Sequence, residues 1–153
     1  MNIDKINTTL ALTANVGILI GLFVVVLELR QNQASLDASI QLTLSAAYQE
    51  ISSQAVENGD FAEVLEKVFV RPDDLDTVDS IRLTNWTQEY IVLLFATYEL
   101  RNKGVVSEEL WVHNARYFAW FLEDPSYRQH YNQFNRDIFP EEFFMALESH
   151  ISD

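Results

Sequence analysis

The chain begins with one long apolar segment and continues as a series of amphipathic segments. Residues 10 to 27 hold eighteen positions without a charged side chain, and Glu28, Leu29 and Arg30 follow. Counted as helix to Leu29, the segment is about 30 Å long, which matches the hydrocarbon thickness of a bilayer. Residues 10–29 are therefore predicted to form a single transmembrane helix. Two alternatives stay open, a cleaved signal peptide and a buried core helix of a soluble protein.

The helical pattern does not stop where the apolar segment ends. Gly and Pro are absent between Leu27 and Glu57, and apolar residues recur there at helical spacing. The membrane helix is therefore predicted to continue over residues 30–57 as an amphipathic juxtamembrane stalk. Its apolar stripe comprises Leu36, Ile40, Leu44, Ala47, Tyr48, Ile51 and Ala55.

Residues 58–153 are predicted to form about five further helices that pack on the stalk as a small bundle. Asn58-Gly59 ends the stalk, and Asp60 with Glu63 resembles a capping box at the start of a short helix. A long helix is expected from about Thr77 to Lys103, with Gly104 as its stop. Its expected core stripe is Val78, Ile81, Trp86, Tyr90, Leu93, Leu94, Thr97 and Leu100.

Three shorter helices complete the predicted bundle. Ser107 with Glu108 and Glu109 starts the first, and Asp124-Pro125 both ends it and starts the second. Pro140 opens the third. The fold class that follows is all-α, with a short tail at residues 1–9 before the membrane helix.

Composition agrees with a helical protein and excludes several partners and sites. Four Gly and three Pro are too few for a strand-rich fold, and the absence of Cys removes thiolate sites and disulfides. Ten Lys and Arg against 23 Asp and Glu give a net charge of −13. A nucleic-acid partner is not expected, because such a surface repels phosphate.

Candidate chemistry is sparse, and no catalytic, cofactor or metal site is predicted. The acidic run of residues 71–79 lacks an EF-hand pattern and suits helix capping. Glu109 and His113 share a helical face, but this spacing is also that of an ordinary surface ion pair. Glu89 and Glu99 are interpreted as structural partners of Arg82, Arg101 or Arg116 rather than catalytic acids. The chain is thus not expected to be an enzyme.

Two sets of residues are candidates for binding. Thr13, Gly17 and Gly21 recur every four residues, so they line one face on which a second membrane helix can approach closely. The second set is rich in aromatic side chains, which form either the core or a ligand pocket. It comprises Trp86, Tyr90, Tyr98, Glu99, Trp111 and Tyr117.

Two stretches carry a resemblance to a known group of proteins. They are LELRQNQASLDASIQLTLSAAYQE, directly after the apolar segment, and YELRNKGVVSEELW, at residues 98–111. In both, the chain resembles an uncharacterised bacterial family of small proteins with one transmembrane helix, an Arg-Gln-Asn-type juxtamembrane exit and a helical domain. The resemblance implies a bacterial inner membrane and favours the cytoplasmic side for the domain. The basic residues themselves leave the side open, because Lys5 before the apolar segment is balanced by Arg30 after it. The resemblance implies no activity.

The expected function is that of a membrane-anchored, non-enzymatic interaction protein. It would act as an accessory subunit or a homo-oligomeric scaffold, with a protein partner or a second copy bound through the membrane helix. The alternative is a membrane-tethered sensor that binds a small ligand in an aromatic-lined pocket.

Overall fold

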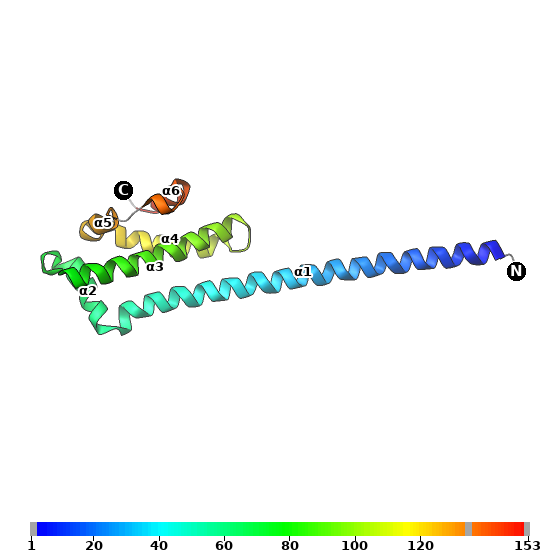
Figure 1. Cartoon of the computed structure of the whole chain (residues 1–153), viewed down its shortest axis with the longest axis horizontal. Coiled ribbons are helices and arrows are strands. Elements are labelled where there is room, and N and C mark those ends of the chain that lie inside the picture. Colours follow the sequence, from blue (N-terminus) through cyan, green and yellow to red (C-terminus); the bar gives the residue numbers. More distant parts are fainter. Residues whose placement is uncertain (1–2, 134–135, 152–153) are drawn as a thin grey trace. The chain divides into compact units, whose positions relative to one another are not determined.

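Every regular element in the described part of the chain is helical (Figure 1). The structure is a computed structural model that describes the backbone of residues 3–133 and 136–151, and the side chains of residues 14–55, 57–133 and 136–151. Its α-helices are α1 (Ile3–Glu57), α2 (Gly59–Val70), α3 (Thr77–Asn102), α4 (Glu108–Glu123), α5 (Pro125–Tyr131) and α6 (Glu141–Glu148), with short 3₁₀ turns η1 (Pro72–Asp74) and η2 (Arg136–Ile138). The predicted all-α fold class is confirmed.

The first helix is unbroken from Ile3 to Glu57. Its continuation beyond residue 27 was predicted from the absence of Gly and Pro there. It starts earlier than expected, because the predicted tail at residues 1–9 is helical from Ile3 onwards. The sequence contains no Pro or Gly there to prevent this. The chain divides after Ser39 into two compact units, which are described separately.

Side-chain caps set the starts of three helices. At α3, the carboxylate of Asp76 accepts a hydrogen bond from the Asp79 backbone N–H at 2.8 Å. The carboxylate of Asp79 in turn accepts from the Asp76 backbone N–H, which completes a capping box. Ser107 caps α4, and Asp124 accepts from two backbone N–H groups at the start of α5. The capping box predicted from Asp60 and Glu63 is wrong. The α2 helix begins at Gly59 after Asn58, whose side chain makes no capping bond.

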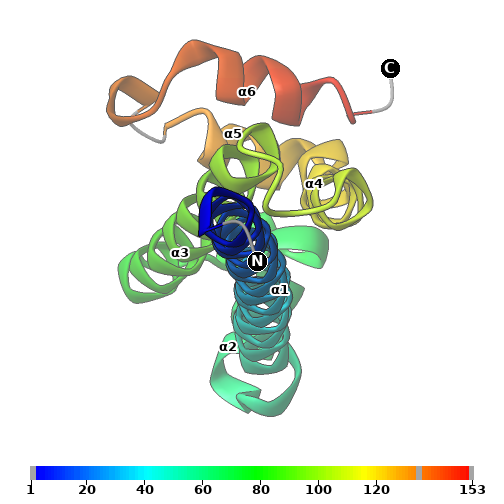
Figure 2. The same ribbon diagram turned by 90° about the vertical axis from the view of Figure 1, so that its right-hand side faces the viewer.

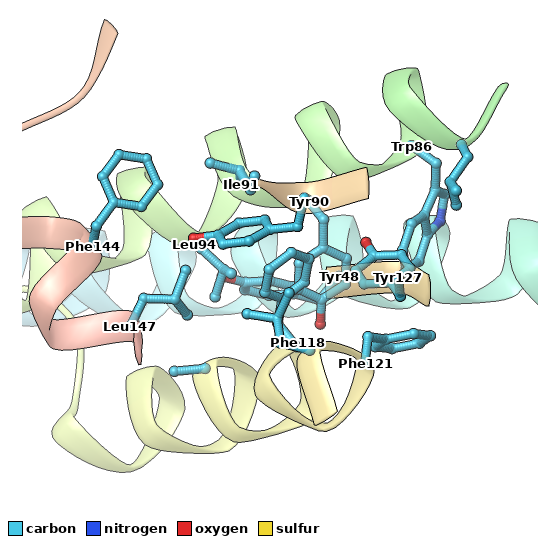
Figure 3. Packing of buried hydrophobic residues seen from close by; sticks show 14 of the residues in the cluster. Tyr48, Trp86, Tyr90, Ile91, Leu94, Phe118, Phe121, Tyr127, Phe144 and Leu147 are labelled. Atoms are coloured by element: carbon cyan, nitrogen blue, oxygen red, sulfur yellow. The ribbon is translucent and has the colours of Figure 1, made fainter. Parts of the chain in front are cut away.

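The core of residues 40–153 is built largely from aromatic side chains (Figure 3). Tyr90 lies at its centre, where it packs on Tyr48, Trp86 and Phe118 with ring centroids 5.2–5.6 Å apart. Phe143 extends the cluster into α6 through contacts with Phe95 and Tyr98. The α4 helix packs against α3, α5 and α6 (Figure 2). Such rings bury large apolar areas, so they dominate the stability of this small domain.

The last turns of α1 belong to this domain and run antiparallel to α3. Three side-chain hydrogen bonds fix the register: Gln41 to the Val105 carbonyl, Tyr48 to Thr97, and the Trp86 indole N–H to the Ile51 carbonyl. Leu44 and Tyr48 are buried, and Ile40, Ala47, Ile51 and Ala55 are half-buried. The predicted stripe thus faces the domain from Ile40 onwards.

Three members of the predicted stripes are exposed. Leu36 lies before the domain and is 58% exposed, while Val78 and Ile81 are 54% and 56% exposed at the start of α3. For Val78 and Ile81 the predicted core position is wrong, because Asp79 and Leu83 turn inward in this part of α3. Asp79 is buried beside Lys67, whose ammonium lies 2.8 Å from its carboxylate.

Candidate functional site

The most conspicuous surface of the first unit is its apolar helix. In the described part of the chain, this helix is long and apolar enough to cross a membrane, and none of its most apolar eighteen-residue stretch is buried. The side chains of Val16, Ile18, Leu19, Ile20, Leu22, Phe23, Val24, Val25, Val26, Leu27 and Leu29 are all exposed. An apolar surface of this kind requires lipid or another protein to cover it.

The predicted small-residue face lies on this helix. A Cβ atom added at Gly17 or Gly21 would meet nothing within 4 Å. Both positions are therefore open toward whatever surrounds the helix. The side chain of Thr13 lies outside the described residues.

The predicted aromatic set divides between the core and the surface. Trp86, Tyr90 and Trp111 are buried. Tyr98 is half-buried against Trp111, whose ring centroid lies 5.5 Å away. Tyr117 is 40% exposed and stacks on Tyr90.

Glu99 and its neighbours form different ion pairs from those expected. Its carboxylate lies 3.7 Å from Lys103 one turn along α3, and Arg101 pairs with Glu108 at 2.9 Å. Arg82 lies 4.0 Å from Asp60. The expected pairing of Glu89 and Glu99 with Arg82, Arg101 or Arg116 is therefore wrong among the described residues. Lys103 from the next turn of α3 pairs with Glu99, Glu108 from the start of α4 pairs with Arg101, and Asp60 from α2 pairs with Arg82.

A groove of about 670 Å³ runs between residues 47–54 of α1 and residues 85–96 of α3. Its apolar lining includes Ala47 and Ile51 from one helix and Val92 and Ala96 from the other. Its exposed polar lining includes Glu50 on α1 and Glu89 on α3. The large rings of Tyr48, Trp86 and Tyr90 between the helices keep the two backbones apart, and the alanines leave the space above them unfilled.

A smaller groove of about 370 Å³ lies on the other side of the same α1 segment, against α4. Its lining includes three residues that were candidates for binding or chemistry from the sequence, namely Tyr90, His113 and Tyr117. His113 is exposed, and so is Glu109 one turn earlier. An exposed pair of this kind lacks the desolvated surroundings of a general base.

The pair with the closest likeness to a nucleophile and its base is Thr84 with His130. The Thr84 hydroxyl lies 3.0 Å from His130 Nε2, and burial lowers the pKa of His130. The same hydroxyl donates to the Ser80 carbonyl at 2.8 Å. Since a hydroxyl has a single proton, His130 Nε2 must donate to Thr84, which is the reverse of what activation of Thr84 needs.

The described residues place no group of three or more His, Cys, Asp or Glu side chains where they could hold a metal ion. The His150 ring packs against Trp111 in a tilted arrangement, with ring centroids 6.2 Å apart. Burial lowers the pKa of His150, and the positive charge of Arg116 adds to this effect. These contacts are those of a packed side chain.

Comparison of the chain with models of protein families, with curated proteins and with solved structures finds no match.

Sequence reasoning singled out one residue of the groove between α1 and α3, Glu89, but for a different role. It placed Ala47, Ile51 and Leu93 in the apolar stripes that face the core, and it did not single out Glu50, Val92 or Ala96. The sequence does place a small residue on each of the two helices, Ala47 and Ala96. These residues indicate a groove only if the two helices lie side by side, and the spacing of apolar residues does not show which helices pair.

Proposed function

We propose that this protein is a membrane-anchored interaction protein without catalytic activity of its own. The observation that carries the proposal is the uncovered apolar stretch of α1, which has the length and composition of a membrane-crossing helix and whose exposed side chains lipid would cover. The domain formed by residues 40–153 has a well-packed aromatic core. In this proposal it serves as the part that meets a partner.

The proposal includes a location. The Arg-Gln-Asn exit at residues 30–32 and the stretch at residues 98–111 support membership of the bacterial family that the sequence resembles. The membrane would then be the bacterial inner membrane and the domain would lie on its cytoplasmic side. The partner is an integral membrane protein or a second copy that contacts the face of Gly17 and Gly21.

Crosslinking in native membranes tests this function. The full-length chain, expressed in its own host, should give a reproducible crosslinked species of defined mass. Gly17→Ile with Gly21→Ile should reduce its yield, because the bulky side chains keep the partner helix away from this face. The matched control, Ile18→Leu with Leu22→Ile, should leave it unchanged.

The substitutions at the two glycines are not expected to disturb contacts within the chain itself. A Cβ atom added at Gly17 or Gly21 meets nothing within 4 Å, so a change in crosslinking is expected to report a contact with another molecule. A chain that stays monomeric, with no reproducible partner, would contradict the proposal. A crosslinked species with the same yield in both variant pairs would place the contact elsewhere and contradict the proposed membrane interface.

A further inference from the structure

The groove between α1 and α3 combines an apolar lining with acidic edges. Ala47, Ile51 and Ala96 are half-buried and Val92 is 49% exposed, so these apolar side chains form a floor of the groove that solvent can reach. Glu50 and Glu89 are exposed on opposite helices, and the residues that line the groove include no Lys, Arg or His. Each edge therefore presents a negative charge beside an apolar strip.

The dimensions of the groove match a helix. Along α3 the lining extends from Asn85 to Ala96, which is eleven residue steps and about 16 Å, or three helical turns. A helix placed there would present side chains at i, i+3, i+4 and i+7 to the apolar strip. The small side chains of Ala47 and Ala96 let its backbone approach closely, as at other helix contacts with small residues.

We propose that this groove binds an amphipathic helix of a partner protein, with an apolar face that packs on Val92 and Ile51 and basic residues on its flanks that meet Glu50 and Glu89. The inference rests on the proposed function, because it names the kind of partner that the anchored domain recognises. Charge complementarity selects this occupant. The domain has unpaired acidic edges at the groove, and the partner supplies Lys or Arg on both sides of an apolar stripe.

The same charges argue against a second copy and against a lipid surface as the occupant. The chain carries a net charge of −13 with ten basic residues in total. A second copy would therefore bring another acidic surface to acidic edges. An anionic bilayer would meet the same repulsion.

A peptide of defined composition provides the probe. The full-length chain is inserted in nanodiscs of zwitterionic lipid, and empty nanodiscs serve as the blank for partition of the peptide into lipid. The probe is a fluorescent 14-residue helical peptide with Leu at i, i+3, i+4 and i+7 and Lys on the flanking positions. Its anisotropy should rise with the chain present and saturate. A version with Lys replaced by Glu, and a scrambled version with Leu spread around the helix, should each bind at least about tenfold more weakly.

Matched variants locate the binding. Val92→Lys should weaken binding at least about tenfold, because it places a charged side chain on the apolar strip. Met145→Lys adds the same charge at a position that is 65% exposed on α6, and should change binding less than about twofold. Glu50→Gln with Glu89→Gln should weaken binding, while Glu109→Gln with Glu142→Gln, which removes two exposed charges elsewhere, should not.

Several results would overturn the inference. They are equal binding of the Lys and Glu peptides, equal weakening by the groove and control variants, and unchanged binding after Val92→Lys. Since the chain has no Cys, Val92→Cys gives a unique thiol. Efficient crosslinking of this thiol to a second copy of the chain would identify that copy as the occupant and also overturn the inference. Failure of the chain to enter nanodiscs would instead contradict the proposed anchoring, so the two ideas fail in different measurements.

Discussion

Two buried tyrosine–threonine pairs connect α3 to its neighbours, and they differ in what remains when the tyrosine hydroxyl is removed. The Tyr48 hydroxyl lies 2.8 Å from Thr97, and Tyr127 lies 2.8 Å from Thr87. The Thr97 hydroxyl already donates to the Leu93 carbonyl at 2.8 Å. Tyr48 must therefore be the donor in its pair, and Thr97 keeps its own bond when Tyr48 becomes Phe.

In the second pair, the threonine hydroxyl has no second hydrogen bond of this kind. Thr87 is 1% exposed and Tyr127 is fully buried, and the hydrogen bond to Tyr127 is the one bond that the structure gives to the Thr87 hydroxyl. Tyr127→Phe thus leaves a buried hydroxyl without a partner. The loss of an ordinary buried hydrogen bond costs about 1 kcal/mol, and leaving a buried group unpaired costs about 1–3 kcal/mol. We expect Tyr48→Phe to cost about 1 kcal/mol and Tyr127→Phe about 2 kcal/mol.

Urea unfolding of the full-length chain in detergent micelles, followed by far-ultraviolet circular dichroism, measures both values. At a slope of about 2 kcal/mol per molar urea, the midpoint should fall by about 0.5 M for Tyr48→Phe and by about 1 M for Tyr127→Phe. Combining Tyr127→Phe with Thr87→Val removes the orphaned hydroxyl and should recover much of the loss. An equal or larger cost at Tyr48, or no recovery in the double variant, would refute the reasoning.

Two further predictions concern the ends of α3. The ammonium of Lys67 holds the pKa of Asp79 below its usual range, so the stabilisation from Asp79 is present above its unfolded pKa of about 4 and is lost as the pH falls through its folded pKa. In the Asp79→Asn variant, the urea midpoint, measured between pH 7 and pH 2, should therefore fall less steeply below about pH 4 than in the unaltered chain. An equally steep fall in both chains would contradict this. Gly104 has a φ of +72° with open space around it, so Gly104→Ala should lower the free energy of unfolding by about 1–2 kcal/mol through the backbone alone. The control Gly59→Ala, at the start of α2, should be neutral or slightly stabilising. Equal effects of the two substitutions would show that the left-handed conformation is not what matters at Gly104.

Helix boundaries could largely be predicted from the sequence because local chemistry sets them. Ser107, Asp124 and Gly104 cap or stop helices through contacts within a few residues of their own position. The failed capping box at Asp60 shows the limit of this reasoning. Asn58 and Gly59 already turn the chain there, so the helix begins before Asp60 can act as its cap.

Burial could be predicted less well, because it depends on which helices meet. The spacing of Val78 and Ile81 is as helical as that of Trp86 and Tyr90, but α3 turns Leu83 inward instead. Asp79 is buried because Lys67 of α2 lies beside it, and no pattern within α3 indicates this contact. The groove between α1 and α3 was missed for the same reason. It depends on two segments about 40 residues apart that the sequence does not pair.

Insertion of the apolar part of α1 into a membrane is the premise of the proposed function, and it can be measured directly. Extraction of membranes with alkaline carbonate, combined with the intact mass of the chain, should show the full-length protein in the pellet with residues 1–29 retained. Leu19→Arg with Val24→Arg should release it, because each Arg near the centre of a membrane helix costs about 2.5–3.5 kcal/mol on insertion. The control, Leu42→Arg with Val78→Arg, changes two exposed apolar residues outside the span and should stay in the pellet. Release of the unaltered chain, or loss of its first 29 residues by cleavage, would contradict the account.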